Sequence, residues 1–199
     1  MEAAGLIAGS GWASGINLYL VALMLGMAGR LGWAEIPDVL TRLDVMIVAG
    51  ILFLIEFVVD KIPFVDSVWD VVHTVIRPLG AAGLGAVIAG DSASIGAAVG
   101  AAVAGALALD AHAAKASTRV VVNTSPEPVS NIGLSLAEDI GVAGLITLAV
   151  TYPVPTIIIV AILAVAATAL TIWIWRTARR SWKKLGAWLA DQAWYPSTG

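Results

Sequence analysis

Residues 56–78 read EFVVDKIPFVDSVWDVVHTVIRP, a strongly charged stretch within an otherwise apolar chain. Of the 199 residues, 59% are hydrophobic and only 13% are charged, and the mean hydropathy is +0.91. Soluble domains usually carry about 25% charged residues, so this chain has too few polar groups to cover a globular surface in water. Lipid removes that requirement, and the sequence therefore predicts an integral membrane protein.

Apolar segments on both sides of the charged stretch predict about six membrane-spanning helices of about 20 residues each. The predicted spans are 4–29, 45–59, 80–90, 95–122, 132–150 and 156–175. Residues 63–77 are too short and too charged to cross, so they predict a separate helix that does not span. The predicted fold class is an all-α polytopic membrane protein, with a transmembrane core at 1–152 and a final helix and tail at 153–199.

Two features bear on topology. Small and polar residues at 10–17 of the first apolar segment indicate either close helix packing or a local break.

The tail is rich in tryptophan and in basic residues, and the basic residues are Arg176, Arg179, Arg180, Lys183 and Lys184. Such residues after a span mark the cytoplasmic side and the interface, so an interfacial helix is predicted there, and six crossings place both termini in the cytoplasm.

An acid is followed five residues later by lysine in both Glu56/Lys61 and Asp110/Lys115. Each pair ends or nearly ends an apolar segment, which suggests an internal repeat of 5–77 and 79–152. The predicted topology makes the repeat a parallel one, although transporters use parallel and inverted repeats alike.

Polar residues of the charged stretch share one helical face. Asp66, Asp70, His73 and Arg77 are spaced i, i+4, i+7 and i+11, which gives one continuous stripe. The stripe could face water at the membrane surface. Lysine and arginine are the usual residues against anionic lipid, however, and two aspartates favour a stripe that faces the protein interior.

Further ionisable groups lie within or beside the other spans, where they need a partner or a cavity. Their natural partners are one another, so we expect Asp60-Lys61 and Asp110-Lys115 to meet close to Glu138-Asp139. A purely structural salt-bridge network is the alternative to a substrate or ion site. The candidate site residues are Glu56, Asp60, Lys61, Asp66, Asp70, His73, Arg77, His112, Lys115, Arg119, Asn123, Glu138 and Asp139.

Other chemistries have weaker support in the sequence. Asp70, His73 and His112 could supply metal ligands, but the neighbouring bases would repel a cation, and the question of a metal stays open. The chain has no cysteine, which excludes disulfides and thiolate ligands. We expect no cofactor and no nucleic acid partner, whereas membrane lipids and a second copy of the chain are expected partners.

The sequence resembles a family of bacterial membrane proteins called domain of unknown function 4126. The resemblance covers about residues 5–152 and is carried by 56–78, by Ser14-Gly15-Ile16-Asn17, by 112–119 and by 123–139. It implies a small multi-pass protein of the inner membrane and supplies no activity.

These features favour a transporter or channel for a small anionic solute, an anionic lipid headgroup or protons. The alternatives are an intramembrane enzyme, which is less favoured, and a structural or accessory membrane subunit.

The predicted orientation can be tested with single cysteines, because the chain contains none of its own. In intact cells, Asp91→Cys should react with an impermeant thiol reagent added outside, and Ser197→Cys should react only after the cells are opened. The reverse pattern would contradict a cytoplasmic tail.

Overall fold

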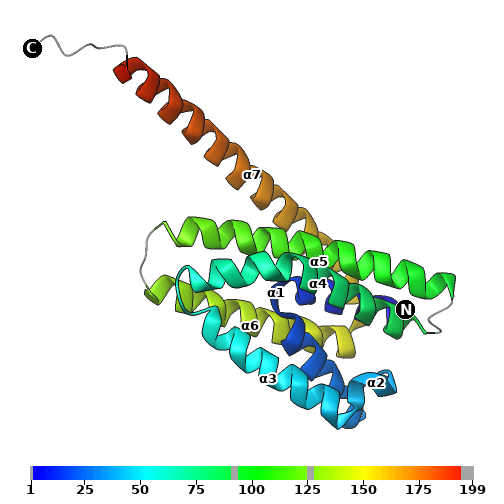
Figure 1. Cartoon of the computed structure of the whole chain (residues 1–199). Helices are drawn as coiled ribbons and strands as arrows, with labels where there is room; N and C mark the ends of the chain where they lie inside the picture. The colour runs from blue at the N-terminus through cyan, green and yellow to red at the C-terminus, as the bar shows by residue number, and fades with distance from the viewer. Residues whose placement is uncertain (1, 91–93, 125–127, 194–199) are drawn as a thin grey trace, which may run out of the picture.

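The computed structural model describes residues 2–90, 94–124 and 128–193 (Figure 1). All the regular structure within these ranges is helical. The helices are α1 (Glu2–Arg30), α2 (Asp38–Thr41), α3 (Leu43–Val59), α4 (Val65–Ala89), α5 (Ile95–Val122), α6 (Pro128–Thr151) and α7 (Pro153–Ala193). Five of them, α1 and α4 to α7, are long and apolar enough to cross a membrane. The predicted all-α polytopic fold is confirmed.

Helix α1 folds back on itself halfway along its length. Asn17 has φ −148° and ψ 93°, which breaks the helix into one arm at 2–16 and another at 18–30. Gly5 in the first arm packs against Pro153, and a pocket that Glu2 lines is also lined by Trp33, just beyond the second arm. Both ends of α1 therefore lie at the end of the bundle where α6 meets α7, as Figure 1 shows.

Helix α1 as a whole is long and apolar enough for the predicted crossing of residues 4–29, but the break at Asn17 divides that length between two arms. The first arm is about 22 Å long and the second about 20 Å, and each is shorter than the roughly 30 Å hydrocarbon layer. Re-entrant backbone is tolerated at membrane depth only where protein surrounds it. In agreement, 61% of the apolar window of α1 is buried, against 11% in α7. We call this element the α1 hairpin and residues 15–17 its tip.

The charged stretch also differs from its prediction, because residues 65–77 are the first half of α4 rather than a separate helix. Helix α4 has 25 residues in all and continues past Pro78 to Ala89, so that 80–90 is not a span of its own. Length and mean hydropathy then suffice for a crossing. The prediction failed because charge was taken to forbid a span, whereas buried partners permit one.

Helices α4 and α5 approach each other closely through small residues. A Cβ atom added at Gly85 would collide with the backbone carbonyl of Gly100, and one added at Gly100 would collide with that of Gly85. The side-chain oxygen of Ser94 caps α5 by accepting a hydrogen bond from Ala97 N at 3.0 Å. The close approach at Gly85 and Gly100 lets α4 and α5 hold their polar faces together.

The last helix, α7, runs for 41 residues without a break, so the basic tail continues the final span as the same helix. It contacts α5 where Thr168 Oγ1 donates a hydrogen bond to Asp110 Oδ1 at 2.6 Å. Beyond that contact α7 diverges from the bundle (Figure 1).

The fold-back of α1 predicts that residues 3 and 35 lie on the same side of the membrane. Single cysteines at Ala3 and Glu35, which are both exposed, should therefore react with an impermeant reagent from the same side of right-side-out vesicles. Labelling from opposite sides would mean that α1 crosses the membrane.

Candidate functional site

The centre of the molecule is organised around the buried guanidinium group of Arg77, in the middle of α4. Its Nη2 lies 2.5 Å from Glu56 Oε1 of α3. Its Nη1 lies 3.0 Å from Oδ1 of Asp70, which precedes Arg77 by seven residues on α4. Nη1 also points at the carbonyl oxygen of Gly15, in the tip of the α1 hairpin, at 3.3 Å. One cation thus ties α1, α3 and α4 together.

A second buried cation, Lys115, extends from α5 toward the same region. Its Nζ donates to Asp60 Oδ2 at 2.6 Å and to the carbonyl oxygen of Ile16 at 3.0 Å. Nζ also lies 3.9 Å from Glu56 Oε1 and 3.6 Å from Glu138 Oε2. Lys115 therefore links the Arg77 group to helix α6 and binds the hairpin tip from the α5 side.

The third cation, Arg119, lies one helical turn farther along α5. It donates to Glu138 Oε2 at 2.7 Å and to the backbone carbonyl of Asp60 at 2.7 Å. Asp66 Oδ2 lies 3.4 Å from Arg119 Nη1, and Asp66 Oδ1 accepts from Asn123 Nδ2 at 3.0 Å. The charge network thus continues without a gap from the centre of the bundle to the α5–α6 end.

Hydrogen bonds fix the tautomer of both histidines. A guanidinium can only donate, so His112 Nδ1, 2.8 Å from Arg77 Nη1, is an acceptor. Thr74 Oγ1 donates to Asp70 O and accepts from His112 Nε2 at 3.0 Å. His73 Nδ1 donates to Trp69 O at 2.9 Å, and its Nε2 lies 3.0 Å from the Tyr19 hydroxyl, which can donate to it. The His112 ring is therefore neutral, and the neutral form of His73 satisfies both of its contacts.

Asn17 holds the tip of the α1 hairpin in place. Its Oδ1 accepts a hydrogen bond from Leu20 N at 3.0 Å, which caps the second arm, and its Nδ2 donates to Asp139 Oδ1 at 3.0 Å. The first arm ends with the carbonyls that face Arg77 and Lys115, so two cations lie at a helix C-terminus, where the helix dipole favours positive charge.

The network carries more acids than bases. Its ion pairs join Glu56, Asp60, Asp66, Asp70 and Glu138 to Arg77, Lys115 and Arg119. With both histidines neutral, five carboxylates against three bases would leave a formal charge of −2 in the interior.

Several carboxylate oxygens in this region are buried without a hydrogen-bond partner among the described residues. They are Glu56 Oε2, Asp60 Oδ1 and Asp70 Oδ2, and each belongs to a side chain that is at least 96% buried. A buried ionised oxygen without a donor is costly, whereas a protonated carboxyl group lowers that cost.

The structure brings most of the predicted site residues together. Glu56, Asp60, Arg77, Lys115 and Arg119 are all buried, and the stripe from Asp66 to Arg77 faces the protein interior, as predicted. The expected meeting of Asp60 with Lys115, close to Glu138, is confirmed.

Three ionisable residues lie outside the ion pairs of Arg77, Lys115 and Arg119. Lys61 is only half-buried: it donates to Phe57 O and Ser135 Oγ and stands 3.0 Å over the Phe57 ring. Its burial lowers the pKa of the Lys61 ammonium group from the ordinary value. Asp139 pairs with the Asn17 amide instead of a base, and Asp110, expected near the network, bonds to α7.

Sequence reasoning missed the polar partners that carry no charge. These are the carbonyls of Gly15 and Ile16, the side chains of Asn17, Tyr19 and Thr74, and Asn131, whose Nδ2 donates to Asn123 Oδ1. The Ser-Gly-Ile-Asn run was the available signal for the first three, because asparagine is a favoured helix cap.

Among the described residues no group of three or more histidine, aspartate or glutamate side chains is arranged to hold a metal ion. His112 in particular has one ring nitrogen against Arg77 and the other against Thr74.

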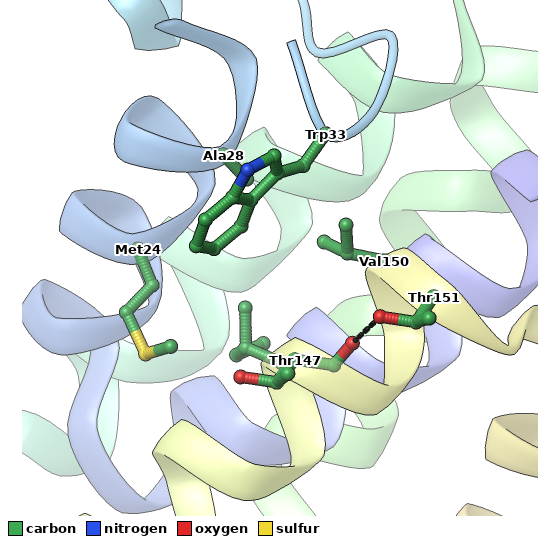
Figure 2. A pocket seen from close by; sticks show the side chains of 7 residues that line it. Met24, Ala28, Trp33, Thr147, Val150 and Thr151 are labelled. Atoms are coloured by element: carbon green, nitrogen blue, oxygen red, sulfur yellow. Dashed lines mark hydrogen bonds between the residues drawn. The ribbon is translucent and has the colours of Figure 1, made fainter. Parts of the chain in front are cut away.

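A separate pocket of about 370 Å³ lies at the α6–α7 end, between the second arm of α1 and α6 (Figure 2). Its lining residues are Met24, Ala28, Trp33, Ile146, Thr147, Val150 and Thr151. Between this pocket and the hairpin tip, Val21 and Leu25 of α1 and Val142 of α6 are fully buried. This apolar layer separates the pocket from the charge network along the second arm.

Comparison with known proteins gives a family for the chain. The family model described as Domain of unknown function (DUF4126) matches residues 4–176, which includes the apolar part of α7 as well as the residues that carry the resemblance. No curated protein and no solved structure matches the chain.

The pair of Lys115 and Asp60 predicts how the network responds to removal of one charge. Lys115→Ala should destabilise the folded protein by on the order of a few kcal/mol, because it leaves the Asp60 carboxylate buried without its cation. Thermal unfolding of the purified protein in detergent measures the loss, with exposed Lys184→Ala as the matched control.

Adding Asp60→Asn to Lys115→Ala should restore much of the stability, because the uncompensated charge is gone. If the single variant is as stable as Lys184→Ala, the pair does not contribute as its geometry implies.

Proposed function

The chain belongs to the family described as Domain of unknown function (DUF4126), and from its buried charge network we propose that it is a membrane transporter that moves protons. The observation that carries the proposal is the excess of five carboxylates over three bases in a buried, continuous network. Ionisable groups at membrane depth that exceed their partners are typical of proton relays.

Protons suit the arrangement better than the other solutes predicted from the sequence. An anionic solute or lipid headgroup would enter a region that is already negative, and each cation there has carboxylate partners within 4.0 Å. A proton instead neutralises a carboxylate whose oxygen is buried without a donor.

The network supports a route for half of the crossing. From the α5–α6 end, the groups follow one another as Asp66, Arg119, Glu138, Lys115 and Glu56, and they end at Arg77 beside the hairpin tip. Carboxylates along this series can exchange protons, while the bases hold the carboxylates in position.

Two buried hydroxyl groups supply candidates for the second half of the route. Ser14 and Ser10 lie on the first arm of α1, four residues apart on one helical face, and their Oγ atoms have no hydrogen-bond partner among the described residues. The second arm offers no such groups and is sealed by the apolar layer at Val21 and Leu25. We therefore propose that protons pass along the first arm.

The orientation follows from the tail. With the basic stretch of α7 in the cytoplasm, the charge network lies in the cytoplasmic half of the membrane, and the ends of α1 lie on the opposite side. The N-terminus would then be periplasmic rather than cytoplasmic, because α1 does not cross.

A structural or accessory subunit is the second candidate, and the density of ion pairs around Arg77 and Lys115 favours it. The two candidates differ in what Lys115→Ala/Asp60→Asn should do. A protein that folds but no longer moves protons requires the charges for transport, whereas restored folding with unchanged proton flux would leave the pair with a structural role.

Proton flux into liposomes tests the proposal directly. Vesicles containing the purified protein and a trapped pH-sensitive dye should acidify when a potassium diffusion potential, negative inside, is imposed with valinomycin. Glu56→Gln should lower the flux by about a hundredfold, the lower end of what a positioned proton-transfer group contributes. It should fold, because Arg77 retains Asp70 as its counter-charge.

Glu35→Gln, on an exposed residue outside the network, is the matched control and should conduct as the unchanged protein does. Flux no greater than in empty vesicles, or equal flux in both variants, would contradict the proposal.

A further inference from the structure

A groove opens toward the bilayer where α7 diverges from α5. It begins beside the contact between Asp110 and Thr168 and has a volume of about 290 Å³. Its walls are mainly apolar and include Leu109, Ala113, Ala116 and Val120 of α5 and Ile174 and Ala178 of α7. On α5 it extends from Leu109 to Val120, which corresponds to about 16 Å along the helix axis.

The floor of the groove adjoins the charge network. Thr74 and His112 line it, and His112 Nδ1 contacts Arg77 behind it. The polar side-chain atoms of Thr74 and His112 are already paired, since Thr74 Oγ1 donates to Asp70 O and accepts from His112 Nε2, which leaves Ser117 as the further polar side chain of the lining. A polar ligand would find few free partners, so an occupant of this floor is a hydrocarbon chain.

The mouth of the groove is basic. Trp175 lines the groove, and Arg179 follows it by four residues, so that Arg179 extends the same side of α7 toward the end of the groove. Arg179 is exposed and has no acid within four residues in either direction. A tryptophan at the interface and an arginine beside it are the groups that bind the glycerol and phosphate region of an anionic lipid.

We infer that this groove holds one acyl chain of an anionic phospholipid, whose phosphate is bound by Arg179. The acyl chain covers His112 and Thr74 and so shields the Arg77 guanidinium group from the rest of the bilayer. This site is independent of proton movement, because it depends only on the surface between α5 and α7.

Lipid retention measured by native mass spectrometry tests the inference on the full-length protein. The protein is titrated in non-ionic detergent with dioleoyl phosphatidylglycerol or with dioleoyl phosphatidylcholine. One phosphatidylglycerol should be retained at a concentration about fivefold lower than phosphatidylcholine, as expected for one basic side chain at an anionic headgroup.

Two variants locate the site. Arg179→Gln should abolish the preference for phosphatidylglycerol, and Ala116→Leu, which fills the groove, should abolish retention of either lipid. Their controls are Lys184→Gln, on the opposite side of α7, and Ala166→Leu, on its exposed surface, and both should behave as the unchanged protein.

Equal retention of the two lipids would overturn the inference, and so would retention that survives Ala116→Leu. A preference that Lys184→Gln lowers as much as Arg179→Gln would mean diffuse attraction to the basic tail, and would overturn it as well.

Discussion

The burial of Arg77 in the middle of a membrane-crossing helix is the constraint on which the rest of the structure depends. A guanidinium group is always charged and cannot be left against lipid, so it requires anions and carbonyl oxygens at the same depth. Glu56, Asp70 and the Gly15 carbonyl supply them from three helices. That last contact explains the α1 hairpin, because only a helix that ends inside the membrane can offer a free carbonyl there.

The same constraint explains why the network is acidic in excess. Three bases stacked along α4 and α5 hold the bundle together, but the five carboxylates around them exceed what neutralisation requires. A structure selected only for stability would replace buried ion pairs with apolar residues at little cost. The surplus carboxylates, with unpaired oxygens on Glu56 and Asp70, support the proposed role in carrying protons.

Much of the candidate site could be predicted from the sequence, because charges spaced at helical periods in an apolar chain must face one another. That reasoning correctly turned the stripe from Asp66 to Arg77 inward and joined Lys115 to Asp60. It failed for topology, because residues 65–77 were predicted to lie outside the membrane on account of their charges. The sequence does not show that these charges have buried partners. The small and polar residues at 10–17 did indicate close packing or a local break, but the fold-back of the chain at Asn17 could not be predicted, since its partners Arg77 and Lys115 lie far away in the sequence.

If the network carries protons, it keeps at least one carboxyl group protonated inside the membrane. Infrared spectroscopy of the protein in lipid at neutral pH measures this directly, through the carbonyl stretch of protonated carboxyl groups and its shift in D₂O. We expect such a band, and we expect Glu56→Gln to diminish or shift it, because Glu56 and Asp70 share Arg77. A spectrum that contains only ionised carboxylates at neutral pH would mean that the network holds no proton, and would rule out the proton-carrying role.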